Sequence, residues 1–399
     1  MSAPFLSDAN ELQEKLVAIR RDLHAHPELG FQEVRTARVV AEELNSLGYE
    51  VVTGVGKTGV VGLLAGGKSG DQTVLLRFDM DALPIEEAND VPYRSQTPGL
   101  MHACGHDAHV AVGLGVANVL AKHRDELPGT IKLMFQPAEE GLGGAMAMID
   151  DGVLKGPDVD VALGLHVTSM VPLGCAVIRS GSMMAAADEA TITVHGRGGH
   201  AAHPEQATDA VLIGSHIVVA LQTIVSRNLH PEEVGVLTVG SIQSGQASNV
   251  IAETATLRCS VRSFEQETRE MLHRRIREVA TGIAATFGAT VEVDIHFGVD
   301  PTVNAPAPTA VMYEAAAEVL GSEQIDTTFR TTGGEDFSAV LQRVPGNFFF
   351  LGARNDARNL NFPHHNPHFD IDETCLSQGV AILSDAAVRC LNGELNKHQ

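Results

Sequence analysis

Short, almost uninterrupted apolar runs alternate along much of the chain with segments that have a helical period. The runs "TVLLRFD" and "VALGLHV" are apolar nearly throughout, which is typical of strands buried on both faces of a sheet. Strands that alternate with helices indicate an α/β sheet, largely parallel, with helices on both faces. We therefore expect strands at 58–66, 73–79, 130–136, 161–167 and 347–353, and helices at 8–24, 32–47, 107–124 and 373–391.

The middle of the chain follows a different order of elements. The expected order is a strand at 189–196, a helix at 207–226, strands at 235–243 and 253–263, a helix at 265–287 and a strand at 290–298. This β-α-β-β-α-β order is that of the ferredoxin-like fold. We therefore expect a two-domain α/β protein. Residues 1–186 and 300–399 form a discontinuous domain around a mixed, mostly parallel sheet, and residues 187–299 form an inserted domain.

The length of the chain agrees with two domains, and its net charge limits the partners that we expect. The 399 residues exceed what one hydrophobic core usually holds, and 44% of them are hydrophobic, an ordinary value for a globular protein. The 28 basic and 50 acidic side chains give a net charge of −22, whose field repels nucleic acid and anionic lipid. We therefore expect neither nucleic acid nor a membrane among the partners.

The N-terminus and the cysteines indicate the compartment. The first residues turn charged at once and lack the apolar segment of a secretory signal. No apolar run approaches the roughly 18 residues of a membrane span, so we expect none. The five cysteines are widely scattered and do not resemble a disulfide framework, which favours a reducing compartment. These observations predict a cytoplasmic protein.

Polar side chains gather where the expected strands end. They are Asp79 and Asp81 after one strand, Glu139 and Glu140 after another, and His166 at the end of a third. Cys104 and His106 lie in a loop that opens a helix, and the histidine-rich stretch 362–370 precedes the last helix. In open α/β sheets, ligands bind outside the carboxyl ends of the strands, so we expect these side chains to converge.

The convergence predicts a metal site. Thiolate, imidazole and carboxylate groups in one cleft suit zinc or another late divalent metal. Two metals about 3.5–4 Å apart need a bridging ligand and further ligands for each metal. Such a site also needs a carboxylate that stays off the metals and accepts a proton from water. Adjacent glutamates fit this need because successive side chains diverge, so Glu140 can bind metal while Glu139 faces the water.

Each of these residues also has an ordinary structural explanation. An Asp at a strand end often caps a helix or forms a turn, and two adjacent glutamates often begin a solvated helix. His166, at the end of an apolar strand, is by itself typical of a buried, hydrogen-bonded core residue. Cys104 and His106 could instead form the nucleophile and base of a cysteine amidase. The joint occurrence of all these groups at one edge favours metal, because a cysteine nucleophile would not need two acidic pairs.

Seven motifs then occur in the order seen in one known family: "DMDALP", "MHACGHDAH", "FQPAEEG", "GRGGHAAHP", "ASNVIAETATL", "GGEDF" and "HHNPHFDIDE". From about residue 15 to residue 385 the chain resembles the aminoacylase-like metal-dependent amidohydrolases and metallopeptidases. The resemblance is to the branch that contains hippurate hydrolases, N-acyl amino acid deacetylases and plant auxin-conjugate hydrolases. Related branches have an aspartate where this chain has Cys104.

The resemblance implies a catalytic domain that binds two divalent metal ions per subunit, with Zn, Mn, Co and Ni as candidates. Cys104 resembles the thiolate ligand, expected to bridge the two metals. The other ligands implied by the motifs are His106, Glu140, His166 and His365. His365 is preferred to His364 and His368 because the family histidine directly precedes the "NP" pair.

The same motifs imply roles in catalysis. Glu139 resembles the general base, which takes a proton from the attacking water and then protonates the leaving amine. Asp81 resembles a carboxylate that orients a metal ligand. In the inserted domain, His200 resembles the family histidine that reaches the reacting carbonyl, often from the partner subunit. Asn249 and Arg262 lie where the family binds the carboxylate of the substrate.

The resemblance therefore implies hydrolysis of the amide bond of an N-acyl amino acid, for example an N-acetyl or benzoyl derivative, to a carboxylic acid and an amino acid. A carboxypeptidase or dipeptidase acting on short peptides is the alternative. The inserted domain is expected to be a lid that mediates a homodimer or homotetramer. Glu205 stands where many relatives have histidine, which bears on specificity rather than on the chemistry.

Overall fold

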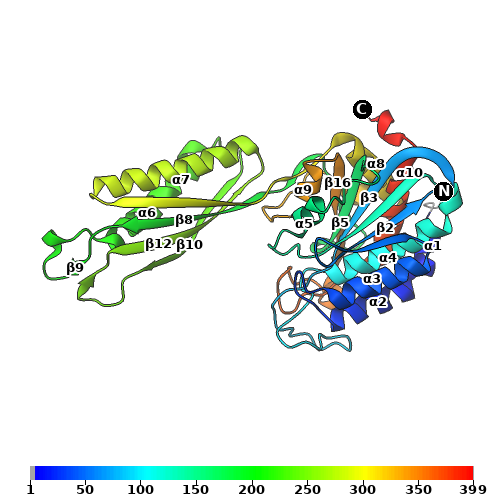
Figure 1. The fold of residues 1–399 in the computed structure, drawn as a ribbon, viewed down its shortest axis with the longest axis horizontal. Coiled ribbons are helices and arrows are strands. Elements are labelled where there is room, and N and C mark those ends of the chain that lie inside the picture. The colour runs from blue at the N-terminus through cyan, green and yellow to red at the C-terminus, as the bar shows by residue number, and fades with distance from the viewer. Residues whose placement is uncertain (1–4, 399) are drawn as a thin grey trace. The chain divides into compact units, whose positions relative to one another are not determined.

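Two separate hydrophobic cores form in the computed structural model, which describes residues 5–398 (Figure 1). The large unit contains the chain up to Gly181, the segment Val303–Phe329 and the chain from Asp336 onward. The small unit contains Ser182–Thr302 and Arg330–Glu335. The predicted fold class, an α/β domain with a second domain inserted into it, is confirmed.

A mixed sheet of eight strands organises the large unit. In spatial order the strands are β1 (Glu50–Val55), β2 (Gly59–Ala65), β4 (Pro128–Gln136), β3 (Lys68–Asp79), β5 (Val161–Pro172), β16 (Gly346–Arg354), β6 (Ala176–Val177) and β15 (Ile325–Asp326). The four central strands β4, β3, β5 and β16 run parallel to one another. Strand β2 runs antiparallel to β1 and β4, and β6 runs antiparallel to β16 but parallel to β15. The parallel strands are the buried apolar runs of the sequence.

Helices cover both faces of this sheet. They are α1 (Leu6–Glu11), α2 (Gln13–Ala25), α3 (Val34–Ser46), α4 (His106–Lys122), α5 (Gly144–Asp150), α8 (Pro306–Leu320), α9 (Ser338–Leu341) and α10 (Cys375–Leu391). Successive strand residues face opposite sides, so Gly59 and Gly62 of β2 point in opposite directions. Gly59 lies against Met148 of α5 and Gly62 lies against Leu44 of α3. Helices α5 and α3 therefore lie on opposite faces.

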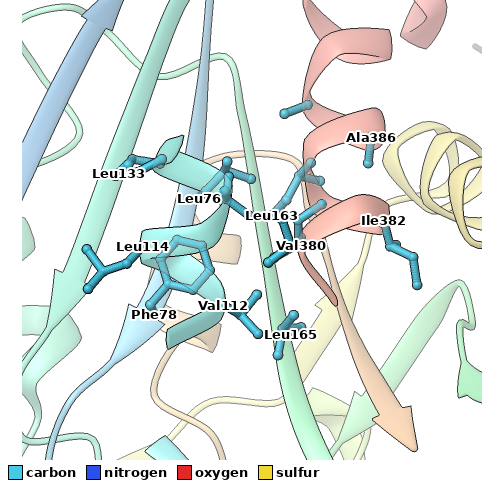
Figure 2. Packing of buried hydrophobic residues seen from close by; sticks show 14 of the residues in the cluster. Leu76, Phe78, Val112, Leu114, Leu133, Leu163, Leu165, Val380, Ile382 and Ala386 are labelled. Carbon is cyan, nitrogen blue, oxygen red and sulfur yellow. The ribbon is translucent and has the colours of Figure 1, made fainter. Parts of the chain in front are cut away.

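Helix α4 packs in the large core beside α10, and both helices lie against the sheet (Figure 2). Nearly every residue of α4 is buried. Leu76 and Phe78 from β3, Leu163 from β5 and Val380 from α10 surround it. This packing fixes the first turn of α4, which begins at His106, against the carboxyl ends of the parallel strands.

The small unit has the predicted ferredoxin-like order. Its elements are β8 (Ala186–His195), α6 (Ala210–Asn228), β10 (Gly235–Ser244), β12 (Thr254–Ser263), α7 (Gln266–Thr286) and β13 (Thr290–Val299). The strands form one antiparallel sheet in the order β10-β12-β8-β13. A short ribbon of β9 (Gly199–His200) and β11 (Val250–Ile251) extends beyond it, and β7 (Gly181–Met184) and β14 (Thr302–Asn304) lie at the joins with the large unit.

The structure corrects several details of the sequence analysis. The expected helix at 8–24 is divided at Leu12 into α1 and α2, and β1 and α8 were not predicted from the sequence. The expectation that no segment reaches the length of a membrane span also needs correction. Helix α6 is long and apolar enough for one by length and composition alone, but one of its faces packs in the core of the small unit.

Candidate metal centre

The carboxyl ends of the parallel strands carry the polar groups that the sequence singled out. β3 ends at Asp79, and β4 ends just before the segment 137–140. His166 lies inside β5, opposite Phe350 of β16. Because these strands are parallel neighbours, side chains at their ends meet at one edge of the sheet.

Cys104 belongs to two groups of side chains that could each hold a cation. The first group is Cys104, His106 and His166, and the second is Cys104, Glu140 and His365. Within each group the ligand atoms lie within 4.8 Å of one another. Cys104 Sγ is 3.5 Å from His166 Nε2, and Glu140 Oε1 is 3.2 Å from His365 Nε2. The structure thus brings together all five expected metal ligands, with the thiol common to both groups.

The hydrogen bonds of two histidines indicate which nitrogen is available to a metal. His106 Nδ1 lies 2.9 Å from the backbone oxygen and 3.1 Å from the side-chain Oδ1 of Asp81. His166 Nδ1 lies 2.7 Å from the carbonyl oxygen of Val167. These oxygens accept, so each Nδ1 carries the proton and each Nε2 keeps a lone pair. His106 Nε2 is buried without a hydrogen-bond partner among the described residues, as expected for a ligand atom.

Asp81 links two of the candidate ligands. Its carboxylate Oδ1 accepts from His106 Nδ1, and its Oδ2 accepts from the backbone N–H of Glu140 at 3.0 Å. One buried carboxylate therefore orients a ring on α4 and the backbone of the loop after β4. This is the geometry of a residue that orients ligands rather than binding the metal itself.

A second buried network lies beneath the site, and its arginine was missed by the sequence analysis. His109 Nδ1 lies 2.5 Å from Asp79, and His109 Nε2 accepts from the backbone N–H of Val167 at 2.9 Å. Both ring nitrogens are therefore used within the protein. Asp79 in turn accepts from Arg77 at 2.5 Å. An arginine inside an otherwise apolar strand was the available signal, because a charge is rarely buried without a partner.

The "FPHHNPHFD" loop places its histidines differently. His364 is mostly buried, and its Nε2 donates to the carbonyl of Val167 at 3.1 Å. His365 is half exposed, has a positive φ of 63° and donates its backbone N–H to Ala103 at 2.8 Å. The side chain of His368 is exposed. Of the three histidines, His365 is the one grouped with Cys104.

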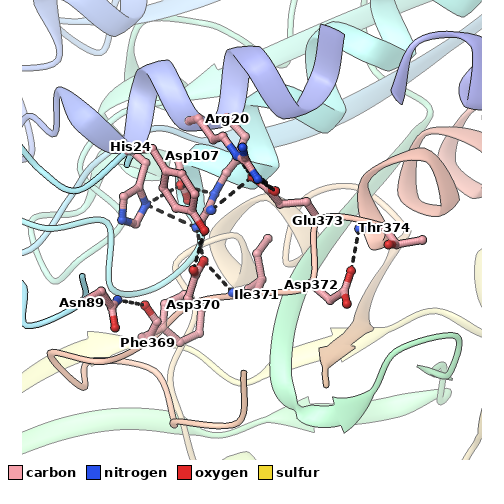
Figure 3. Close-up of polar contacts among 12 residues, drawn as sticks. Arg20, His24, Asn89, Asp107, Phe369, Asp370, Ile371, Asp372, Glu373 and Thr374 are labelled. Carbon is pink, nitrogen blue, oxygen red and sulfur yellow. Dashed lines mark hydrogen bonds and ion pairs between the residues drawn. The ribbon is translucent and has the colours of Figure 1, made fainter. Parts of the chain in front are cut away.

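A buried ion-pair cluster joins the segments that carry the candidate ligands (Figure 3). Arg20 of α2 donates from Nε to Asp107 and from Nη2 to Asp370, each at 2.7 Å. Asp107 directly follows His106, and Asp370 closes the loop that contains His365. The Arg20 side chain is fully buried. The signal in the sequence was a charge in line with Leu16 and Leu23 on the apolar face of a helix.

The charge environment of Cys104 distinguishes a metal ligand from a nucleophile. Burial raises the pKa of the Cys104 thiol well above its ordinary value, and the nearby Glu140 carboxylate raises it further. A cysteine nucleophile needs the opposite shift, because the thiolate is the reactive form. A bound cation would supply the missing positive charge. The donor set and the His106 Nε2 atom, which makes no hydrogen bond among the described residues, therefore fit a pair of divalent cations better than a Cys–His dyad.

In the small unit, the structure separates the three expected substrate residues into two places. His200 lies opposite Val250 in the β9–β11 ribbon, and the N–H of Ala201 donates to the backbone oxygen of Asn249 at 3.1 Å. These two residues therefore lie together beyond the Thr254 end of β12, whereas Arg262 lies near the other end (Figure 1). Eight positions of strand correspond to about 26 Å, so one small ligand cannot contact both places in one copy.

Comparisons with known proteins agree with this site. Residues 75–389 match the sequence pattern of peptidase family M20/M25/M40. Thermostable carboxypeptidase 2 of Saccharolobus solfataricus is 41% identical over 97% of this chain and 98% of its own length. N-acetyl-L-cysteine deacetylase of Bacillus subtilis is 39% identical over 96% of this chain and 89% of its own length. The structure of the Bacillus subtilis YxeP protein, a dinuclear metal-binding peptidase of the M20 family, has a TM-score of 0.84 with 33% identity, covering 96% and 99% of the two chains.

Proposed function

Because this chain belongs to peptidase family M20/M25/M40, and is thus a metal-dependent amidohydrolase, we propose that it uses two divalent cations to hydrolyse the amide bond of N-acyl amino acids. The observation that carries the proposal is the position of Cys104 in two groups of ligands at one sheet edge. A thiolate common to both groups could serve both cations, as a two-metal site requires. Cys104, His106, Glu140, His166 and His365 would hold the metals, drawn from Zn, Mn, Co or Ni.

The residues around the site fit hydrolysis by water. Bound cations would polarise the scissile carbonyl and make water more acidic. Glu139 takes a proton from the water while the water oxygen forms a bond to the amide carbon. Glu139 then passes that proton to the amide nitrogen as the carbon–nitrogen bond breaks. The products are a carboxylic acid and a free amine, so atoms and charge balance. Asp81 holds His106 and Glu140 in place throughout.

The small unit supports recognition of an N-acyl amino acid by two copies of the chain. His200 Nδ1 accepts from the backbone N–H of Ala202 at 3.0 Å, which leaves Nε2–H as a donor for a substrate carbonyl. Arg262 is suited to the substrate carboxylate. Because Arg262 and the His200–Asn249 pair lie at opposite ends of β12, which extends about 26 Å from Thr254 to Arg262, we assign them to the sites of different copies.

A homodimer through the small unit would supply that second copy. The outer edge of β10 has no strand neighbour in the described sheet. The adjacent helix α6 exposes the apolar side chains of Val211, Leu212 and Val219, the last to 70%. An open strand edge beside an apolar helix face is the kind of surface that proteins cover by association.

The five cysteines are unpaired in the described structure, which fits a cytoplasmic enzyme.

Peptide cleavage is the second candidate function. It is favoured by the similarity to a carboxypeptidase, which covers 97% of this chain. An N-acyl amino acid and a peptide with a free C-terminus present the same amide and carboxylate. The two candidates therefore differ in the acyl side of the bond, which the residues assigned so far do not contact.

A panel of substrates measured before and after chelation tests the proposal. We expect about two metal ions per chain, and hydrolysis of N-acetyl and N-benzoyl amino acids that is lost on chelation and restored by added metal. Faster cleavage of dipeptides than of every N-acyl amino acid would favour the peptidase alternative. Activity that persists after complete metal removal would contradict the mechanism and return Cys104 to the role of nucleophile.

Glu139→Gln tests the base separately. This substitution keeps the size of the side chain but removes the proton acceptor. We expect kcat to fall by about 100- to 10,000-fold while both metals stay bound. Glu140→Gln is the matched comparison, because loss of a ligand should reduce metal content. Near-normal turnover of Glu139→Gln would end the assignment of Glu139 as the base.

A further inference from the structure

The backbone directly before the two glutamates adopts a conformation that needs support. Ala138 has a φ of 53°, in the left-handed region that residues with a Cβ atom rarely enter. Ala138 is also completely buried. This residue sets the direction in which the chain continues to Glu139 and Glu140. Such a conformation persists only where the surrounding structure holds it.

Glu33 provides a direct hold on this residue. It comes just before α3 and is completely buried. Its Oε1 accepts the backbone N–H of Ala138 at 2.8 Å, and its Oε2 accepts the hydroxyl of Thr58 at 2.5 Å. Thr58 lies in the turn between β1 and β2. The carboxylate therefore ties the left-handed residue to a second, separate part of the fold.

Capping of α3 does not explain this carboxylate. Glu33 occupies the position before the first turn of α3, yet its side chain makes no capping hydrogen bond there. Glu28 fulfils that function, because its two carboxylate oxygens accept the backbone N–H groups of Arg35 and Thr36, each at 2.8 Å. The bonds of Glu33 are directed away from its own helix and toward the loop after β4.

Other contacts fix the rest of this loop. The carbonyl of Ala138 accepts from the N–H of Gly144 at 3.0 Å, and the N–H of Glu140 donates to Asp81 at 3.0 Å. A Cβ atom at Gly30 would lie 3.0 Å from Ala138, so the loop before α3 packs directly on this residue. With Asp81 holding the residue after Glu139, Glu33 holds the residue before it.

We propose that Glu33 is a positioning residue for the hydrolysis: its carboxylate holds the left-handed backbone at Ala138 and thereby aims Glu139 at the water. The inference rests on the proposed function, in which Glu139 is the base. Glu33 itself touches neither substrate nor metal in this scheme. It acts through the peptide that joins Ala138 to Glu139.

Two substitutions at Glu33 test the proposal. Glu33→Ala removes both hydrogen bonds, and we expect kcat to fall by about 10- to 100-fold with KM and metal content unchanged. Glu33→Gln should restore most of kcat, because its amide oxygen can accept from Ala138 while its NH₂ donates to Thr58. A purely structural role would lower the melting temperature without this split between kcat and KM.

Glu28→Ala is the matched control. Like Glu33→Ala, this substitution removes a carboxylate that accepts two hydrogen bonds close to α3. The donors to Glu28 are the backbone N–H groups of Arg35 and Thr36, and Glu28 makes no hydrogen bond to Ala138. We expect a lower melting temperature with unchanged kcat. An equal fall of kcat in Glu28→Ala and Glu33→Ala would overturn the proposal, because it would show a general effect of loosening α3.

Ala138→Gly supplies a second, independent test. Glycine enters the left-handed region without the steric cost of a Cβ atom. The double substitution Glu33→Ala with Ala138→Gly should therefore recover a large part of the kcat lost in Glu33→Ala alone. No recovery would contradict the proposal. Should Glu33→Ala not fold, Thr58→Val, which removes the anchor of Glu33, takes its place and must lower kcat at unchanged KM.

The outcomes separate this inference from the proposed function. Full activity of Glu33→Ala together with an inactive Glu139→Gln would overturn the positioning role alone. Near-normal activity of Glu139→Gln would overturn the base assignment, whatever Glu33 does. A fall of kcat in both, with rescue by Glu33→Gln, supports both.

Discussion

A neutral histidine binds a metal with the nitrogen that carries no proton, and at this site neighbouring oxygens decide which nitrogen that is. The carbonyl of Val167 accepts a hydrogen bond from His166 Nδ1–H, and the oxygens of Asp81 accept from His106 Nδ1–H. His109 lies in the same helix turn as His106, but both of its nitrogens are used within the protein. His106 and His166 thus each keep one nitrogen available for a metal, whereas the hydrogen bonds of His109 leave it none.

The same dependence on neighbours holds for a buried carboxylate in the small unit. Asp188 Oδ2 accepts from Arg269 Nε at 2.7 Å, Oδ1 accepts from Arg269 Nη2 at 2.6 Å, and His273 Nε2 lies 2.9 Å from Oδ2. Burial by itself raises the pKa of Asp188, but Arg269 and His273 outweigh it and hold that pKa well below its usual range. Folding therefore stabilises the charged form.

This pairing predicts a pH dependence of stability. A depressed pKa contributes stability that is complete above the unfolded value of about 4 and is lost as the pH falls toward the lower folded value. Asp188→Asn should cost about 3 kcal/mol at pH 7, because it breaks a buried ion pair. We expect its deficit relative to wild type to shrink below about pH 4, where Asp188 of the unfolded wild-type chain becomes protonated while the native carboxylate is still charged.

Hydrogen exchange of the amides of β8 and α7, measured at pH 7, 4 and 3, would report this loss of stability in the small unit. Asp294→Asn on the exposed face of β13 is the control and should leave the protection unchanged. A deficit of Asp188→Asn that stays constant from pH 7 to pH 3 would contradict the assigned pairing.

At the scale of elements, α4 positions the site because it approaches its neighbours unusually closely. A Cβ atom at Gly113 would lie 2.6 Å from the Phe78 ring and 2.8 Å from the Phe135 ring. A Cβ atom at Gly115 would lie 2.5 Å from Val380 of α10. The two glycines permit this close packing, although glycine lowers the intrinsic stability of a helix.

Gly113→Ala should therefore destabilise the large unit despite the better helix propensity of alanine. The methyl group meets two packed aromatic rings, and overpacking of this kind costs about 1–3 kcal/mol. Gly282→Ala in α7 is the matched control, because a Cβ atom there meets nothing within 4 Å. It should stabilise its helix by about 0.5–1 kcal/mol. Urea unfolding of both variants measures the change in the free energy of unfolding. We expect a decrease for Gly113→Ala and an increase for Gly282→Ala, and changes of the same sign would contradict the packing argument.

At the scale of the whole molecule, the candidate ligands come from segments that are far apart in the chain. Cys104 and His166 are 62 positions apart, and Arg20 and Asp370, which brace the same site, are 350 positions apart. Such a site forms only after the parallel strands and the last loop have assembled. We therefore expect metal binding and folding to be coupled, with chelation lowering the melting temperature.

The proposed exchange of residues between two copies can be tested by mixing inactive variants. If His200 acts on the partner's substrate, a mixed dimer of Glu139→Gln and His200→Ala chains contains one site with both native residues. We expect such a dimer to recover about half of wild-type activity, since one of its two sites is complete. Each variant alone should remain nearly inactive. No recovery in a purified mixed dimer would mean that His200 acts within its own chain or not at all.

Much of the fold followed from the sequence because its elements have strong local patterns. The parallel strands read as apolar runs, and the β-α-β-β-α-β order of the inserted domain was evident from periodicity. β1 was missed because it is a largely exposed edge strand, whose pattern depends on its single neighbour. The break between α1 and α2 at Leu12 was missed because that segment lies inside one continuous amphipathic pattern.

By itself, the sequence determined the kinds of groups available at the site, because the thiol, imidazole and carboxylate side chains lie at the expected strand ends and within the motifs. It could not show which groups Arg20, Arg77 and Glu33 brace, because their partners lie on other elements. It also grouped Arg262 with Asn249, which the structure places at opposite ends of β12 within one copy of the chain. Tertiary structure decided these points, because hydrogen-bond direction, backbone strain and distance exist only once remote segments have packed together.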